Sequence, residues 1–122
     1  MEAREEEILL LVEDDVDIRQ ELAALLEAEG YRIVQCANGR EALDRLRSLR
    51  PCLILLDLMM PVMSGWDFRA AQLADPAIAA IPTVVLSGAA QADEEARRLR
   101  ATAFLQKPFD LNPLLQTIEQ YC

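Results

Sequence analysis

Short apolar runs alternate with amphipathic stretches along this chain of 122 residues. Most of the runs are apolar on both faces, which is typical of strands in a parallel sheet that helices cover on each side. The pattern predicts five strands: Ile8–Val12, Tyr31–Ala37, Cys52–Leu56, Thr83–Leu86 and Ala103–Leu105.

The amphipathic stretches between the runs predict helices. A first helix is indicated by apolar positions at helical spacing before Gly30, a residue that commonly ends helices: Ile18, Leu22, Leu25 and Leu26. A second helix begins at Asn38, because Asn38 followed by Glu41 resembles a reciprocal N-terminal cap. Leucines at helical spacing continue this second helix to Pro51.

Three more helices are predicted in the second half of the chain. One covers about Gly65 to Ala74, and a polar, weakly periodic one covers about Gln91 to Arg100. In the last, Asn112 suits the cap and Pro113 the first helical position. One face of this last helix then carries Leu111, Leu115, Ile118 and Cys122.

The alternation of strands and helices predicts an α/β fold with a doubly wound parallel sheet and right-handed crossovers. The chain contains no internal repeat, low-complexity tract or linker. We therefore expect a single domain over residues 1–122, with an acidic N-terminal tail at residues 1–7.

Composition excludes several classes of function. A net charge of −9 argues against direct binding of nucleic acid. The absence of histidine excludes Ser-His-Asp and Cys-His hydrolases and any phosphohistidine formed within this chain. No run is long enough to span a membrane and the first residues are too acidic for a signal peptide, so we expect a cytoplasmic location.

The three cysteines, Cys36, Cys52 and Cys122, show no metal-site spacing such as C-x-x-C. They form no close pair along the chain. We expect all three to be buried or incidental free thiols.

Polar residues of particular chemistry follow the predicted strands. In open α/β sheets, ligands bind beyond the carboxyl ends of the strands. The residues at these ends are Glu13, Asp14 and Asp15 after the first strand, Asp57 after the third, Ser87 after the fourth and Lys107 after the fifth.

Each of these residues has a purely structural explanation. Asp15 or Asp57 could cap the next helix, Ser87 could belong to a turn, and Lys107 could be a solvated surface charge. Their joint occurrence at four strand ends is much harder to ascribe to chance. Clustered carboxylates repel one another, and Mg²⁺ relieves this repulsion while still binding phosphate oxygens. The set therefore predicts Mg²⁺-dependent phosphorylation of a carboxylate, with the ammonium and hydroxyl contacting the transferred group.

The chain resembles the response-regulator receiver family of two-component signalling from Ile8 to Tyr121. Four motifs carry the resemblance in order and spacing: Leu10–Asp15, Leu55–Gly65, Leu86–Ala89 and Phe104–Phe109. The resemblance implies a flavodoxin-like (βα)5 fold with strand order 2-1-3-4-5. It also implies a phosphoryl-accepting switch that catalyses its own phosphorylation and slow dephosphorylation, and is not an enzyme acting on other substrates.

Carried over by motif, Asp57 is the phosphoacceptor and Asp14 a direct Mg²⁺ ligand. Glu13 contributes to the metal site through water, and the backbone carbonyl of Met59 completes it. Asp15 is expected to be a helix cap.

The remaining motif residues contact or sense the phosphoryl group. Lys107 pairs with Asp57 and then with phosphoryl oxygens, while Ser87 and Phe104 are the switch residues. Phe104 has the plain alternative of a core position in its strand. The Lys107–Pro108 peptide is expected to be cis.

Two features depart from the family pattern. Arg100 stands where relatives usually carry glycine, and the segment from Ser87 to Lys107 is slightly short. Both affect the fourth helix and its exit, so we expect an unusual choice of output partner. Met59 and Ala89 are apolar where they border the path of an attacking water, which suggests slow hydrolysis of the phosphoryl group.

The resemblance implies a histidine kinase or phosphotransfer protein as donor and a downstream protein or fused output domain as target. The surface of the fourth helix, last strand and last helix would bind that target, in a monomer or a phosphorylation-dependent dimer. The sequence leaves open whether the domain stands alone or belongs to a larger protein.

Other functions fit less well. A degenerate receiver that never accepts phosphate remains an alternative, although every required side chain is present. An aspartate-nucleophile phosphatase needs a second Asp where Met59 stands, a flavodoxin needs a hydroxyl- and glycine-rich first loop, and a P-loop hydrolase needs G-x-x-x-x-G-K-[ST]. An additional role as a protein-interaction module stays open.

Overall fold

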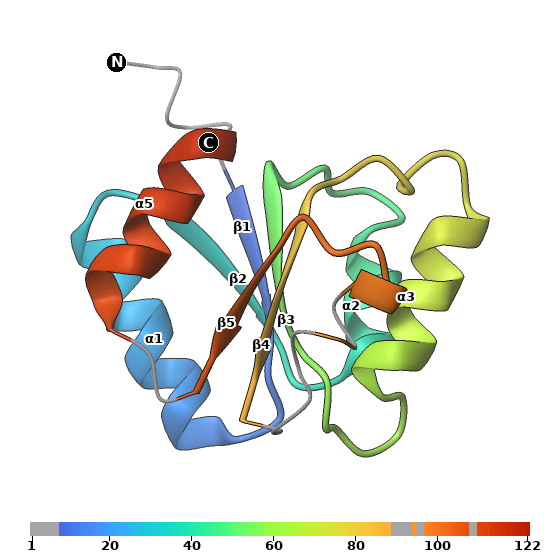
Figure 1. Ribbon diagram of the computed structural model, residues 1–122, viewed down its shortest axis with the longest axis horizontal. Coiled ribbons are helices and arrows are strands. Elements are labelled where there is room, and N and C mark those ends of the chain that lie inside the picture. Colours follow the sequence, from blue (N-terminus) through green and yellow to red (C-terminus); the bar gives the residue numbers. More distant parts are fainter. Residues whose placement is uncertain (1–7, 89–93, 95–96, 108–109) are drawn as a thin grey trace.

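The computed structural model describes residues 8–88, 94, 97–107 and 110–122. All five predicted strands form, within two residues of their predicted bounds, in one parallel sheet of order β2-β1-β3-β4-β5 (Figure 1). They are β1 Ile8–Val12, β2 Arg32–Cys36, β3 Leu53–Asp57, β4 Thr83–Ser87 and β5 Ala103–Gln106. The predicted fold class and strand order are confirmed.

The helices are α1 Val16–Ala28, α2 Gly39–Arg45, α3 Gly65–Ala74 and α5 Leu111–Tyr121. Half of the predicted fourth helix, at positions 91–93, 95 and 96 of the range 91–100, lies outside the described residues. So does Pro108, and with it the predicted cis peptide.

Two apolar layers enclose the sheet, because alternate residues of each central strand point to opposite faces. Leu9 and Leu11 of β1 pack with α1 and α5 on one face. Leu10 and Val12 pack with α2 and α3 on the other. Figure 1 shows these helix pairs on opposite sides of the sheet, as a doubly wound fold requires.

Side-chain caps fix where the first two helices begin. Asp15 accepts a hydrogen bond from the backbone N–H of Ile18 at 3.0 Å, so its predicted capping role is confirmed. Asn38 accepts from Glu41 N–H at 3.0 Å, and Glu41 in turn accepts from the N–H of Ala37 at 2.8 Å. The predicted reciprocal cap forms, with its second bond shifted by one residue.

The second helix is shorter than predicted. It ends at Arg45, and the next residues form turns in which Arg47 and Ser48 donate to carbonyls only three residues back. Pro51 disfavours helical geometry in the residue before it, and the chain leaves the helix earlier than the leucine spacing indicated.

The predicted start of the last helix was wrong by two residues. Asp110 is the N-cap, without a side-chain cap bond, and Pro113 is the third residue of α5. Proline is tolerated there because the first four N–H groups of a helix have no partner inside it. The predicted apolar face is confirmed: Ile118 is buried, together with Leu114, and Leu111, Leu115 and Cys122 pack around them.

The expectation of three free thiols was also wrong. Cys52 and Cys122 form a disulfide across a Cα–Cα distance of 5.6 Å, and only Cys36 is a free, buried thiol. The two residues are 70 positions apart in sequence, and the fold brings the residue before β3 against the end of α5.

A buried polar group that the sequence did not predict joins α3 to the segment before β5. We call Arg69, Gln72 and Thr83, with the carbonyls of Leu99 and Arg100, the arginine cluster. The Arg69 guanidinium donates to Leu99 O at 2.9 Å, Arg100 O at 2.8 Å, Gln72 Oε1 at 2.7 Å and Thr83 Oγ1 at 3.0 Å. Arg69 is only 4 % exposed, and all of these acceptors are neutral. Burial, aided by the charge of Arg100, lowers the pKa of Arg69.

Candidate functional site

The carboxyl ends of the central strands lie together at one edge of the sheet, at the bottom of the view in Figure 1. β1 pairs with β3, β3 with β4 and β4 with β5, all in parallel. Glu13 follows β1 directly, and its N–H donates to Cys36 O on β2 at 3.0 Å, which continues the ladder by one residue. Asp57 is the last residue of β3, and Lys107 follows β5 directly.

Glu13, Asp14, Asp57 and Lys107 meet at this edge, and we call this group the acidic pocket. One carboxylate oxygen from each of the three acids lies within 4.8 Å of the others. Lys107 Nζ lies 2.7 Å from Glu13 Oε1 and 3.4 Å from Asp57 Oδ1. The four residues share an open cavity of about 420 Å³ with Asp15, Ile18, Met59 and Gly88.

Burial dominates the electrostatics of Asp57, which is 5 % exposed. Removal from water, the largest cause, and the negative charge of Glu13 both raise the pKa of Asp57, Lys107 opposes them, and the net pKa is about 6. A carboxylate held this way carries a charge that its surroundings only partly offset.

Lys107 remains a cation despite its burial. Burial alone lowers the pKa of Lys107, but the hydrogen bond that Lys107 donates to Glu13 and the negative charges of Asp57 and Glu13 outweigh it, so the net pKa shift is upward. The pocket therefore holds one firmly protonated ammonium beside three carboxyl groups.

The loop after Asp57 is fixed by a close backbone approach at Gly65. Gly65 donates its N–H to Leu58 O at 2.9 Å, and a Cβ at this position would lie 2.5 Å from Asp57 O and 2.6 Å from Leu58 Cα. Only glycine fits, because backbone atoms cannot yield as the end of a side chain can. This contact holds the start of α3 against the strand end that carries Asp57.

Within the same loop, Val62 has a φ of 69°, in the left-handed region that β-branched residues rarely adopt. Met63 N–H donates to Pro61 O across it at 2.7 Å, which makes a three-residue turn. Strained backbone of this kind is concentrated near functional sites.

The other predicted site residues lie around the pocket at different depths. Ser87 is fully buried at the end of β4, and its carbonyl accepts from Lys107 N–H at 2.8 Å. Met59 lines the cavity with a side chain that is 65 % exposed. Phe104 is half-buried and packs in a separate small cluster with Leu58 and Val85.

The donor set of the acidic pocket fits a hard divalent cation. Mg²⁺ prefers a few carboxylate oxygens and keeps several waters, and a cavity open to solvent leaves room for those waters. Glu13, Asp14 and Asp57 are the described residues that bring their ligand atoms together in this way.

Two contacts were not predicted from the sequence. Lys107 was expected to pair with Asp57, yet Glu13 is the nearer partner. A possible signal existed, since both residues directly follow strands and bear opposite charges. The burial of Arg69 had a weaker signal in the sequence. Arg69 is a charged residue next to Phe68, on the side of α3 that must face the core.

With this geometry in view, comparison with known proteins decides the family. The family model of the response regulator receiver domain matches residues 9–119. The chain belongs to the response regulator receiver family. Receiver domains act as signalling switches in two-component systems, and the resemblance seen in the sequence motifs is confirmed.

Individual relatives agree with this assignment. The chain is 40 % identical over 114 residues to the transcriptional regulatory protein PdtaR of Mycobacterium tuberculosis, covering 91 % of this chain and 54 % of PdtaR. It thus spans about half the length of that relative.

Solved structures show the same fold. The chemotaxis protein CheY4 of Vibrio cholerae superposes with a TM-score of 0.85 at 31 % identity, covering 95 % of this chain and 98 % of CheY4. The response regulator TrrA of Thermotoga maritima, in complex with Mg²⁺ and BeF, superposes with a TM-score of 0.85 at 25 % identity, covering 95 % and 99 %.

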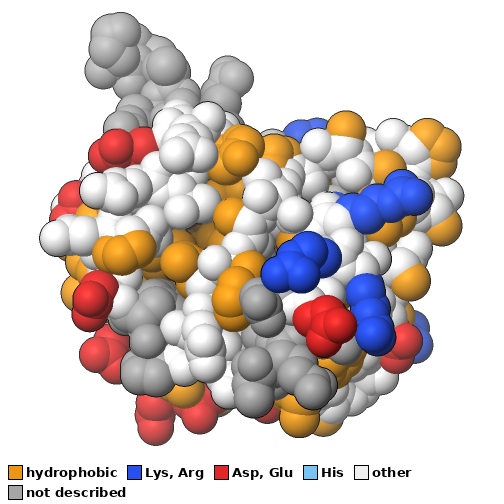
Figure 2. All heavy atoms as spheres, viewed as in Figure 1, with side chains coloured by type: hydrophobic (Ala, Val, Ile, Leu, Met, Phe, Trp, Pro, Cys, Tyr) orange, Lys and Arg blue, Asp and Glu red, His pale blue; other side chains and the backbone are white. Residues whose placement is uncertain are grey.

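Surface character adds two observations. In the part of the chain that the structure describes, no helix has both the length and the apolar character needed to cross a bilayer. On the face shown in Figure 2, acidic side chains gather along the left and lower edges, beside α1 and the carboxyl ends of the strands, and basic ones on the side of α3.

Proposed function

We propose that this receiver accepts a phosphoryl group on Asp57 in a Mg²⁺-dependent reaction, with the phosphohistidine of a histidine kinase or phosphotransfer protein as donor. The observation that carries the proposal is the acidic pocket itself. A buried carboxylate with a raised pKa lies between two further acids and a protonated lysine, in a cavity open to solvent.

Asp57 is the nucleophile. One of its carboxylate oxygens attacks the phosphorus in line with the leaving imidazole nitrogen, and an aspartyl phosphate forms. Asp57 must be ionised to attack, and a pKa of about 6 leaves most molecules ionised at neutral pH.

Lys107 neutralises charge on the phosphoryl oxygens. Its ammonium lies 3.4 Å from Asp57 Oδ1 and is held at 2.7 Å by Glu13, so a short movement of a flexible side chain brings it to the new group. Ser87, at the end of β4, supplies a hydroxyl to another phosphoryl oxygen. Phe104 then repacks as part of the switch.

Asp14, Asp57 and the carbonyl of Met59 are the direct protein ligands of Mg²⁺ in this proposal, and Glu13 acts through water. The bound cation supplies charge neutralisation for the carboxylates and the incoming phosphoryl oxygens. The related TrrA structure, which contains Mg²⁺ and BeF, supports this assignment.

The phosphorylated domain signals through the surface of its fourth helix, β5 and α5, to a protein partner or a fused output domain. Residues 1–122 function as one domain, in the cytoplasm, as a monomer or a phosphorylation-dependent dimer, and any DNA-directed output comes from another domain or protein. The acidic charge of −9 supports the last point.

The phosphoryl group is long-lived. Met59 presents an exposed apolar side chain at the cavity and offers no group to orient an attacking water. Ala89, the second residue of this hypothesis, lies outside the described residues. A half-life of only seconds in the purified protein would contradict it.

The test uses a small-molecule phosphodonor, such as acetyl phosphate, with and without Mg²⁺, and intact mass as readout. We expect one phosphoryl adduct with Mg²⁺ and almost none in EDTA. Asp57→Asn and Asp14→Asn should both abolish it, while Asp44→Asn, an exposed acid on α2, serves as the matched control and should retain it. No adduct on the wild-type protein, and no spectral response to beryllofluoride with Mg²⁺, would instead establish a degenerate receiver.

A further inference from the structure

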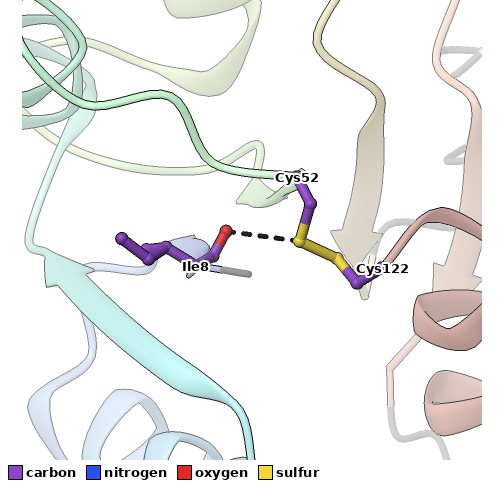
Figure 3. Close-up of a disulfide and its surroundings, with 3 residues drawn as sticks. All are labelled: Ile8, Cys52 and Cys122. Atoms are coloured by element: carbon purple, nitrogen blue, oxygen red, sulfur yellow. Dashed lines mark hydrogen bonds between the residues drawn. A yellow bond between two sulfur atoms is a disulfide. The ribbon is translucent and has the colours of Figure 1, made fainter. Parts of the chain in front are cut away.

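The disulfide lies at the opposite end of the sheet from the acidic pocket. Cys52 directly precedes β3, whose other end is Asp57, and a strand rises about 3.3 Å per residue, so the two sites are separated by roughly 16 Å. Figure 3 shows Cys122, at the end of α5, joined to Cys52 next to the carbonyl of Ile8 at the start of β1. The bond therefore ties the end of α5 to the amino end of the sheet.

Docking of α5 does not depend on this bond alone. Leu114 and Ile118 are fully buried against the sheet and α1, and Leu111 and Leu115 pack beside them. The last turn is different: Glu119, Gln120 and Tyr121 are exposed. Cys122 is thus the residue that holds the end of a helix whose middle is already anchored by apolar packing.

The reduced state is also accommodated. Cys52 Sγ lies 3.4 Å from Ile8 O, and a thiol at this position can donate a hydrogen bond to that carbonyl, whereas a disulfide sulfur has no hydrogen to donate. Both cysteines are half-buried, so neither is enclosed in the core as Cys36 is. Neither the loss of a polar partner nor full burial opposes reduction.

We propose that Cys52 and Cys122 form a reversible thiol–disulfide clamp that sets how firmly the end of α5 is held, without acting on the acidic pocket. The reaction partner is a low-molecular-weight disulfide or dithiol.

In oxidation, one cysteine thiolate attacks a sulfur of the small disulfide and releases one small thiol, which leaves a mixed disulfide. The second cysteine thiolate then attacks the protein sulfur and releases the second small thiol. In total two thiol protons and two electrons leave the protein, and the small disulfide is reduced to two thiols. A dithiol reverses both steps and is itself oxidised.

The clamp bears on signalling because α5 belongs to the surface that we propose for output. A reduced domain would present a frayed α5 end to its partner and an oxidised one a fixed end, whether or not Asp57 carries a phosphoryl group. This consequence rests on the proposed function, but the clamp itself does not.

The test combines intact mass with hydrogen exchange on the full chain, in glutathione disulfide and in dithiothreitol. Oxidation should remove two hydrogens. In dithiothreitol, exchange in residues 119–122 should accelerate by about tenfold or more, while exchange in α1 stays unchanged, since local opening of a helix end need not involve the rest of the fold. Returning the protein to glutathione disulfide should restore slow exchange.

Variants assign the effect to the clamp. Cys52→Ser and Cys122→Ser should each exchange as the reduced protein does under both conditions, whereas Cys36→Ser, which alters the buried free thiol, should keep the redox response.

Three outcomes would overturn the proposal: no internal disulfide in glutathione disulfide, equal exchange of residues 119–122 in both states, or faster exchange of α1 upon reduction. The last would show a bond needed for the whole fold. If phosphorylation of Asp57 fails in both states while the α5 response persists, the proposed function is wrong and the clamp stands.

Discussion

The acidic pocket and the arginine cluster both bury charge, but they do so in opposite ways. Arg69 uses its guanidinium to bond four neutral acceptors, so its charge is dispersed over carbonyl, amide and hydroxyl dipoles. Asp57 lies beside Glu13 and Asp14 with Lys107 at 3.4 Å, and its pKa is raised to about 6. The charge of Arg69 is compensated within the fold, whereas that of Asp57 is not.

This difference indicates which buried charge is structural and which is functional. A fully hydrogen-bonded ion contributes to a unique packing of its surroundings and gains nothing from a ligand. A cluster of carboxylates with too little positive charge is destabilising until a cation or a chemical change relieves it. Replacing Arg69 should therefore lower the free energy of unfolding of the protein, whereas replacing Asp57 should raise it.

The largest effect on stability is expected for Arg69→Ala. The substitution leaves Gln72, Thr83 and two carbonyls without their donor and opens a cavity, which should lower the free energy of unfolding by about 3 to 5 kcal/mol. Urea unfolding measures this change. A loss below about 1 kcal/mol for Arg69→Ala would show that the cluster is not structural.

Asp57→Asn should have the opposite sign. In metal-free buffer at pH 7.5 the amide carries no charge to bury, and the free energy of unfolding should rise by about 1 to 3 kcal/mol. The same urea experiment, with Asp44→Asn as an exposed control, provides the measurement. Destabilisation by Asp57→Asn would contradict the view of an under-compensated pocket.

The pH dependence of this stabilisation follows from the raised pKa of Asp57. The Asp57 carboxyl keeps its proton up to a pH of about 6 in the folded state, but only up to a pH of about 3.8 in the unfolded state. The favourable contribution of the protonated carboxyl is therefore complete below 3.8 and is lost as pH rises to about 6. The difference in free energy of unfolding between Asp57→Asn and the wild-type protein should widen over this pH window and be constant above it.

Mg²⁺ should offset the excess negative charge of the acidic pocket and so stabilise the folded protein. At a concentration ten times its Kd, a cation that binds only the folded state raises the free energy of unfolding by about 1.4 kcal/mol. Thermal unfolding with and without Mg²⁺ should show this gain for the wild-type protein and little of it for Asp14→Asn. Equal gains in both proteins would place the bound cation elsewhere.

The smallest change is expected for Arg100→Gly. Arg100 has a φ of 55°, in the region that glycine adopts without steric cost, and only its backbone carbonyl serves the arginine cluster. The substitution should be neutral or stabilise the protein by up to about 1 kcal/mol in urea unfolding. A clear loss would mean that the Arg100 side chain itself supports this segment.

The parts of this structure set by local patterns could be predicted from the sequence. The strands follow from apolar runs, and the caps at Asp15 and Asn38 from short-range spacing. The gathering of Glu13, Asp57 and Lys107 follows from parallel strands that end at one edge, whereas the strand order itself came from the family resemblance.

The features that were missed depend on three-dimensional contacts between distant residues. Nothing in the spacing of Cys52 and Cys122 reveals a bond across 70 residues. The preference of Lys107 for Glu13 over Asp57 depends on distances of 2.7 and 3.4 Å, which no pattern encodes. Arg69 is buried only because acceptors from three separate segments surround it.

The central claim is that Asp57 carries the phosphoryl group, and chemical mapping tests it most directly. After reaction with a phosphodonor and Mg²⁺, borohydride reduces an aspartyl phosphate to homoserine, which peptide mass spectrometry locates. We predict homoserine at position 57 only, dependent on Mg²⁺. Homoserine at Asp14, at Asp15 or at any other aspartate, with position 57 unchanged, would contradict the account.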